Sequence, residues 1–498
     1  MLRPERSMNI PTSSVRRMAA AGLFLLAASC TAGPKEPPAT EPPPAGALLP
    51  VQGGAVDPSR QPAPRWWEPL GDPVLDGLIA RAEERNQSLA AAIANVRAAY
   101  AAVGASEADL WPSVGAGAQY TRTLTNIAQL AAAGVRVEPY DTYAYGVGMS
   151  AWEIDLWGGV KRQVEAAQAT AASQVDTLRD ALVSVRSQVA SSYLQLRTLQ
   201  AQRVVLVANR DALASSRDLV KARYEAGATN ALDLARAQAA LDGVEAQIPQ
   251  VDAGISSSIS TIAVLCGANP AEMAPTVAEP RELPTAPDVA GIGLPEEILA
   301  RRPDVRAARQ RLLAATAAIG VAEAQRLPTL TVSGNFYIAA NGLDGLDDLS
   351  NKAYSIGPSL YLPLFTGGKI ESAVRQQRAE AEGALAQYRQ SVLAAVGDVS
   401  ACVGDFVQAR ETHARADAAL GSARQALALA QQQYDAGVTD FSTLLDVQRS
   451  ALDAENSAVE ARAGVVQGFV ALQRALGAGW SEDEQVVATA EKPSKESR

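Results

Sequence analysis

One proline-free stretch sets the architecture of the chain: residues 158–224 read GGVKRQVEAAQATAASQVDTLRDALVSVRSQVASSYLQLRTLQAQRVVLVANRDALASSRDLVKARY. Its seam positions recur in alternating steps of four and three, the heptad spacing of helices that pack side by side. These positions are Leu178, Leu182, Val185, Val189, Ser192, Leu196, Leu199, Arg203, Leu206, Arg210, Leu213, Arg217, Val220 and Tyr224. At about 1.5 Å per residue the predicted helix is about 100 Å long, far longer than a globular domain requires.

A second proline-free stretch, residues 368–434, repeats this rhythm. Its apolar positions include Val392, Val396, Val399, Val403 and Phe406. Helices of this length are stable only when neighbouring helices cover their apolar stripes. The sequence therefore predicts a bundle, a barrel of helices or an extended coiled coil.

Before each long helix the hydrophobic period changes from helical to alternating. Residues 114–121 and 143–150 alternate in the first half, and residues 330–336 and 356–364 alternate in the second half. Each run has about the length of a strand that crosses a bilayer at a tilt. Because a sheet in a bilayer has to close without a free edge, we expect the chains to associate. A trimer with about twelve strands is the smallest closed structure of comfortable size.

The two halves are copies of one another. The segment VGASEA at 103–108 is echoed by IGVAEA at 319–324, and YEAG at 224–227 by YDAG at 434–437. This duplication predicts two repeats of helix, hairpin, long helix and return helix. The chain is predicted to begin with a signal peptide at 1–29 and a tether at 30–64. The first repeat spans 65–280, with its hairpin at 113–157 and long helix at 158–224, and a connector at 281–303 follows it. The second repeat spans 304–480, with its hairpin at 329–365 and long helix at 368–434, and a disordered tail at 481–498 ends the chain.

The N-terminus is typical of an exported protein. Arg16 and Arg17 precede an apolar run, which ends in LAASC at residues 26–30. This ending resembles a bacterial lipobox, in which Cys30 receives a diacylglycerol and an N-acyl chain and becomes the first residue. An ordinary secretory signal with a chance cysteine is the alternative. The residue after the cysteine is Thr31 and not aspartate. This pattern resembles the signal that sorts such lipoproteins to the outer membrane.

The composition excludes several function classes. A net charge of −10 and the lack of a basic run in the mature region argue against a nucleic-acid partner. The chain has one histidine, His413, and its three cysteines lack CxxC spacing, so metal, redox and imidazole chemistry are not expected. Glu153 and Asp155 are paired carboxylates without a nucleophile motif nearby, which favours a structural role over catalysis. No run of eighteen apolar residues follows the signal, so no transmembrane helix is expected.

Several motifs resemble the TolC-like outer-membrane efflux proteins in family order. They are WEIDLWG at 152–158, GLPEEILARRPDV at 293–305, Gly357-Pro358 and PLFTGG at 363–368, and with the lipobox they resemble the NodT-type lipoprotein branch. The resemblance implies a mainly helical, non-enzymatic homotrimer with four strands per protomer in a twelve-stranded outer-membrane β-barrel, continued by a long periplasmic α-helical barrel. Implied partners are a periplasmic adaptor (membrane fusion) protein, an inner-membrane transporter of the resistance-nodulation-division (RND) class and outer-membrane lipid. The chain would be a passive, gated duct for drugs, dyes, detergents or metal ions.

The resemblance also implies a periplasmic gate. By this resemblance Asp446 forms the constriction and Arg449 is the basic residue linked to it. Tyr434 and Asp233 match residues that tie neighbouring helices together in the closed state. Three copies of Asp446 around an axis would place like charges at a narrow mouth, which favours cations and requires donors to hold the carboxylates. The alternative is that these residues are ordinary caps and surface charges near a helical turn.

Other functions remain open at this point. A lipid-anchored periplasmic coiled-coil scaffold explains the heptads but not the hairpins. A periplasmic adaptor usually carries one helical hairpin, whereas two are predicted here. An outer-membrane duct for type I protein secretion is a further alternative.

Overall fold

The computed structural model describes residues 31–37, 54–124 and 138–482, and its contacts divide the chain into two compact units. The sheet unit contains the described residues of 1–39, 98–172 and 309–387, and the helical unit contains the described residues of 40–97, 173–308 and 388–498. Each unit takes residues from both sequence repeats. The predicted signal peptide, Cys30, much of the tether, and the tail beyond residue 482 lie outside the described residues.

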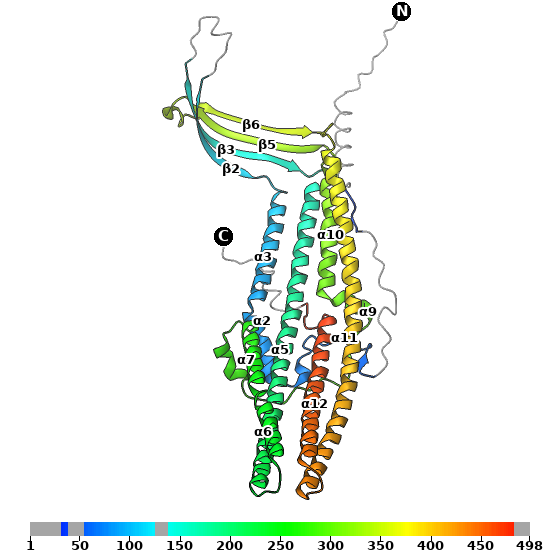
Figure 1. The fold of residues 1–498 in the computed structure, drawn as a ribbon. Helices are drawn as coiled ribbons and strands as arrows, with labels where there is room; N and C mark the ends of the chain where they lie inside the picture. Colours follow the sequence, from blue (N-terminus) through cyan, green and yellow to red (C-terminus); the bar gives the residue numbers. More distant parts are fainter. Residues whose placement is uncertain (1–30, 38–53, 125–137, 483–498) are drawn as a thin grey trace, which may run out of the picture. The chain divides into compact units, whose positions relative to one another are not determined.

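Four antiparallel strands form the sheet unit: β2 (Val114–Thr123), β3 (Tyr140–Ile154), β5 (Thr329–Ala340) and β6 (Lys352–Tyr361). Their order is β2-β3-β5-β6, so the two predicted hairpins are joined through β3 and β5 into one sheet (Figure 1). Two short 3₁₀ turns, Leu343–Gly345 and Leu349–Asn351, lie between β5 and β6. In the single chain β2 and β6 each have one unpaired edge.

The register gives the sheet two chemically different faces. Val147 pairs with Ala116 on β2 and with Phe336 on β5, and Phe336 pairs with Tyr354 on β6, so these four side chains share one face. The charged residues Arg122, Asp141 and Lys352 lie on this face near the strand ends. Its apolar members include Val114, Ala116, Ala118, Tyr120, Tyr143, Tyr145, Val147, Met149, Val332, Phe336, Ile338, Tyr354, Ile356 and Leu360. The opposite face carries small and polar residues, among them Gly117, Gly146, Asn335 and Ser355. The alternation in the sequence therefore separates an apolar face from a polar one.

Residues next to the strands form the joint between sheet and helices within the sheet unit. The indole of Trp152 donates to the Leu110 carbonyl (3.1 Å), and that of Trp157 donates to the Pro328 carbonyl (2.7 Å). The Asp155 carboxylate accepts the Lys161 N–H at 2.9 Å in the first turn of the following helix, which is the structural role expected for it. Both indoles thus tie a strand end to the chain that leads into a neighbouring strand.

The two long helices are α5 (Gly159–Glu225) and α11 (Lys369–Asp435), each of 67 residues. The prediction of two matching helices of this length is confirmed, and with the four strands so is the mainly helical fold class. By length and composition alone, Lys369–Asp435 and Gln87–Ala108 are apolar enough to cross a membrane, contrary to the expectation from the sequence. A helix of 67 residues is about three times longer than a membrane span, and α11 reaches this apolarity in an alanine-rich sequence.

Shorter helices complete the fold, and proline and asparagine account for two of the breaks between them. The leading helix of the first repeat is interrupted at Asn86, whose extended backbone ends one helix and whose Oδ1 caps the next by accepting the Ser88 N–H (2.9 Å). The return helix of the first repeat is broken beside Pro249, whereas that of the second is continuous. The remaining elements are β1 (Val56–Asp57), a 3₁₀ turn (Glu68–Leu70), α2 (Pro73–Arg85), α3 (Gln87–Ala108), α6 (Ala231–Glu245), α7 (Ile248–Leu265), α8 (Pro270–Val277), β4 (Ala290–Gly291), α9 (Pro295–Arg301), α10 (Pro303–Ala324) and α12 (Phe441–Ala475).

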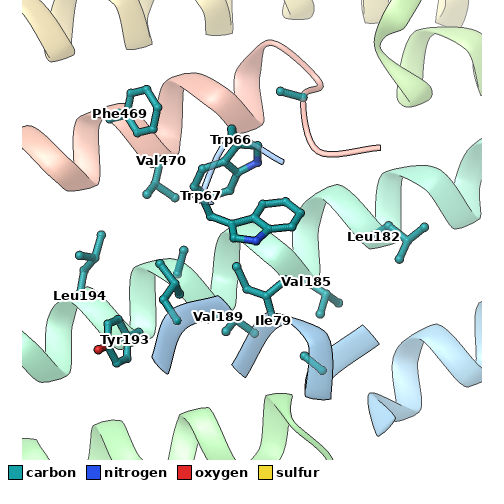
Figure 2. Packing of buried hydrophobic residues seen from close by; sticks show 14 of the residues in the cluster. Trp66, Trp67, Ile79, Leu182, Val185, Val189, Tyr193, Leu194, Phe469 and Val470 are labelled. Carbon is teal, nitrogen blue, oxygen red and sulfur yellow. The ribbon is translucent and has the colours of Figure 1, made fainter. Parts of the chain in front are cut away.

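The main core of the helical unit joins residues from both ends of the chain (Figure 2). Trp66 lies 5.6 Å from Trp67 and 6.2 Å from Phe469 of α12, measured between ring centroids. The heptad residues Val185 and Val189 of α5 are buried in the same cluster. Burial of each such side chain stabilises the fold by about 1.5–3 kcal/mol. The heptad stripe of α5 is therefore covered by elements of both repeats.

Candidate functional site

The turns that end the long helices are built alike in the two repeats. Gly227 (φ +70°) follows α5 and Gly437 (φ +72°) follows α11. The N–H of the residue after each glycine donates to a carbonyl in the last helical turn, Ala228 to Arg223 (2.7 Å) and Val438 to Gln433 (2.8 Å). These bonds close the helix ends in the left-handed turn that glycine permits.

The return helices begin with matching side-chain caps. Asn230 Oδ1 accepts the Asp233 N–H at 3.0 Å, and Asp440 Oδ1 accepts the Thr443 N–H at 2.8 Å. The bonds from the Thr443 backbone and side chain and from Ser442 lower the pKa of the exposed Asp440 carboxyl. Each turn thus positions the first residues of α6 or α12 through local hydrogen bonds.

Tyr434 is the one predicted gate residue that is buried, with 6% of its surface exposed. Its ring lies 5.8 Å from the Phe441 ring across the turn, and the Arg223 guanidinium lies over it at 4.5 Å from the ring centroid. Arg223 belongs to α5, so this cation–π contact joins the two helical hairpins of the chain. Within the described residues Tyr434 makes this connection through its ring.

Asp233 has a local environment in the single chain. Its Oδ2 accepts a hydrogen bond from the Thr229 hydroxyl at 2.7 Å, in the turn that leads into its own helix. The structure therefore does not bring Asp233 to Tyr434. A tie from Asp233 to a neighbouring helix stays a prediction for the assembled protein.

Asp446 and Arg449 are exposed on α12, three residues apart. Among the described residues neither forms a hydrogen bond or an ion pair with the other or with a third group. Their side chains are free to meet other chains. Arg449 also borders a cavity of about 280 Å³ between α5, α6 and α12.

Sequence reasoning did not single out Arg223, Ser216 or Gln448. The Gln448 amide donates to the Ser216 hydroxyl at 3.2 Å, a second link between the two hairpins. A signal was present in the sequence, because Gln448 interrupts an apolar rhythm that runs through Phe441, Leu444 and Leu445.

Two further polar residues of α11 lie near carboxylates. Arg410 pairs with the Asp288 carboxylate at 3.4 Å, and His413 Nε2 lies 3.7 Å from Asp417 on the same helix. The Cys266 thiol is fully buried, and burial raises its pKa to about 11. Within the ranges that the structure describes, no three His, Cys, Asp or Glu residues are grouped to hold a metal ion.

Comparisons with known proteins agree on one family. The model of the family described as outer membrane efflux protein matches residues 78–268 and 294–478. The chain is 32% identical to the pyoverdine export outer membrane protein OpmQ of Pseudomonas putida, over 89% of this chain and 93% of that protein. It is 30% identical to the outer membrane protein OprJ of Pseudomonas aeruginosa, over 89% and 91% of the two chains.

Solved structures show the same fold. The outer-membrane channel OprN superposes with a TM-score of 0.82 at 31% identity, covering 90% of this chain and all of that one (100%). The Campylobacter jejuni CmeC outer membrane channel has a TM-score of 0.84 at 20% identity, covering 94% and 98% of the two chains, a likeness of fold alone. On this evidence the chain belongs to the outer membrane efflux protein family, and it is an outer-membrane channel of a tripartite efflux system and not an enzyme.

Proposed function

We propose that three copies of this chain form a closed outer-membrane barrel of about twelve strands, continued into the periplasm by their long helices. One observation carries the proposal: the four-stranded sheet has one apolar face, one polar face and two unpaired edges at β2 and β6. An open edge in a bilayer leaves backbone N–H and C=O groups without partners. Pairing β2 of one chain with β6 of the next removes the edges, turns the apolar face to lipid and encloses a polar lumen.

The duct serves small molecules supplied by other proteins. Its relatives include proteins for pyoverdine export and toluene efflux, so we infer that the cargo is a small organic molecule. We assign its energy source to an inner-membrane transporter of the RND class and its connection to a periplasmic adaptor. The exposed tips of the two helical hairpins, around Gly227 and Gly437, are the surfaces available to that adaptor.

A lipid anchor at Cys30 is part of the same proposal. Cys30 lies outside the described residues, but the residues after it do not. The Ala32 N–H donates to the Trp157 carbonyl at 2.9 Å, and Arg162 Nε donates to the Ala32 carbonyl at 3.3 Å. These bonds hold the start of the mature chain beside the joint between β3 and α5, where a membrane boundary would lie, which supports attachment of diacylglycerol and N-acyl chains there.

The gate proposal places Asp446 of three chains around the axis at the narrow mouth. Its exposed carboxylate, free of partners in the single described chain, supports this role, and Arg449 is the nearby donor that would restrain it. Tyr434 holds the two hairpins together, and Asp233 completes the set in contact with a neighbouring chain.

Reconstitution tests the duct. The protein extracted in detergent should be a trimer by native mass spectrometry and should give discrete, cation-selective conductance steps in planar lipid bilayers. Asp446→Ala should raise the conductance and reduce the cation selectivity, because it removes the ring of charge. A water-soluble species that never conducts would refute the trimeric duct, whereas a conducting trimer unaffected by Asp446→Ala would refute only the gate.

Cys30→Ser separates the anchor from the channel. It should abolish incorporation of labelled palmitate while the trimer and its conductance persist, because the sheet itself holds the protein in the membrane. Palmitate incorporation that survives this change would refute the anchor at Cys30.

A further inference from the structure

Gln448 stands at an apolar position of the seam between α12 and α5. Phe441, Leu444 and Leu445 are buried on the same stripe before it, and Ala451 is buried after it. Gln448 itself is only 8% exposed. A single polar residue in an otherwise apolar seam lowers the stability of helix pairing and fixes its register.

Only one of the two polar atoms of the Gln448 amide has a hydrogen-bond partner among the described residues. Its Nε2 donates to Ser216 Oγ of α5 at 3.2 Å, whereas its buried Oε1 has no hydrogen-bond partner in the described part of the chain. An unsatisfied buried polar atom destabilises the conformation that buries it. The contact therefore contributes little net stability to the closed seam, unlike the leucines on either side of it.

A cavity of about 280 Å³ lies beside this amide. Its lining includes Gln448 and Arg449 of α12, Asn209 of α5, and Ala240 and Gly243 of α6. The small residues on α6 leave the space, and the amide and guanidinium groups make it polar.

A polar position in an apolar seam lowers the free energy needed to separate the two helices. Opening a dry apolar seam exposes surface to water at about 25 cal/mol per Å². At Gln448, opening only exchanges one neutral hydrogen bond for hydrogen bonds to water. Because Asp446 lies two residues earlier on the same helix, a displacement of α12 at this point also moves Asp446.

We propose that Gln448 is a positioning residue that sets how readily the gate opens, because its polar contact with Ser216 is the place where α12 separates from α5. This inference rests on the proposed gate at Asp446. The role of Gln448 is distinct from that of the proposed ring of Asp446 carboxylates.

The test replaces Gln448 by methionine, which has a similar length and no amide. In planar bilayers Gln448→Met should lower the open probability about tenfold, the factor that matches removal of one unsatisfied buried polar atom. Trimer yield should be retained and the thermal unfolding midpoint raised. Gln432→Met, the same change at an exposed glutamine of α11, is the matched control and should alter neither quantity.

Ser216→Ala removes the other partner of the contact and should change the open probability in the opposite direction. It leaves the Gln448 amide donor without its acceptor, so the open probability should rise about fivefold. In the Gln448→Met background Ser216→Ala should have no further effect, since the two changes remove one interaction.

Two results separate failure of this inference from failure of the gate. In the first result, Gln448→Met and Gln432→Met give the same open probability while Asp446→Ala still changes the conductance. This would overturn the role of Gln448 and leave the gate intact. If Asp446→Ala also has no effect, the gate itself is refuted. Additive effects of Ser216→Ala and Gln448→Met would likewise overturn the contact as the point of separation.

Discussion

At the scale of single residues, the helical unit holds several charged groups that burial perturbs. Arg302 is 8% exposed and donates to the carboxylates of Asp304 (2.7 Å) and Asp398 (3.2 Å) and to the Ala475 carbonyl (2.7 Å). Desolvation lowers the pKa of Arg302, but the carboxylates of Asp304 and Asp398 outweigh it, so the pKa is raised overall. Arg302 thus connects α12 to the start of α10 and to α11 within this unit.

Asp180 is an acidic group in this region whose burial is only partly offset by the nearby Arg302 and Arg474. Burial, followed by repulsion from Asp304, raises the pKa of its carboxyl. A raised folded-state pKa means that the folded protein binds this proton more tightly than the unfolded chain. The contribution of Asp180 to stability is therefore greatest below the unfolded pKa of about 3.9 and is lost as pH rises through the folded pKa.

Asp180→Asn should accordingly raise the unfolding temperature at neutral pH, because it removes a carboxylate that is costly to bury. The gain should disappear in acid, where the wild-type carboxyl is protonated in both states. Thermal unfolding followed by circular dichroism at pH 7 and pH 3 measures both effects. An Asn variant that is less stable at pH 7 would show that ionised Asp180 has a favourable partner.

At the scale of elements, the turns between long and return helices depend on backbone conformation more than on burial. A Cβ added at Gly227 or Gly437 would meet no atom within 4 Å, yet both glycines have positive φ. Any cost of a side chain there is therefore conformational. An L-residue in the left-handed region costs about 1–2 kcal/mol.

Gly437→Ala should destabilise the turn between α11 and α12 by about 1–2 kcal/mol. The matched control is Gly464→Ala within α12, where a Cβ also meets open space and the glycine φ is not positive. That change should instead stabilise the helix by about 0.5–1 kcal/mol. Hydrogen exchange of the amides at 434–445 distinguishes the two variants, and equal protection in both would contradict the backbone argument.

At the scale of the whole molecule, the two faces of the sheet determine which side meets lipid. Ile356 lies on the apolar face at the middle of β6 and is 74% exposed in the single chain. Ser355 precedes it on the opposite face and bonds to Asn335 of β5 at 2.7 Å. Neighbouring positions of one strand therefore have opposite environments in the proposed barrel.

Ile356→Lys should reduce assembly of the membrane trimer, because a lysine at the middle of the lipid-facing surface costs about 2–4 kcal/mol. Ser355→Lys, with the same charge on the lumen-facing surface, should preserve the trimer and shift ion selectivity toward anions. Trimer yield in outer-membrane fractions and bilayer selectivity measure these outcomes. Equal loss of trimer in both variants would contradict the assignment of the faces.

Local sequence patterns were sufficient to predict most of the elements. The heptad rhythm and the absence of proline predicted both long helices within one residue at each end, and alternation predicted the four strands. These features depend on periodicity and backbone preference, which act over a few residues and can be read without knowledge of distant neighbours.

The amino-acid sequence by itself thus determined the duplication, the two long helices, the four long strands and the two-faced character of these strands. Only the tertiary structure decided the pairing of β3 with β5, the contact of Arg223 with Tyr434 and the bond of Gln448 to Ser216. Ser216 and Gln448 are separated by 232 positions in the chain. Such contacts depend on how two helices are rotated against each other, which follows from the packing of the whole unit and not from the pattern along either helix.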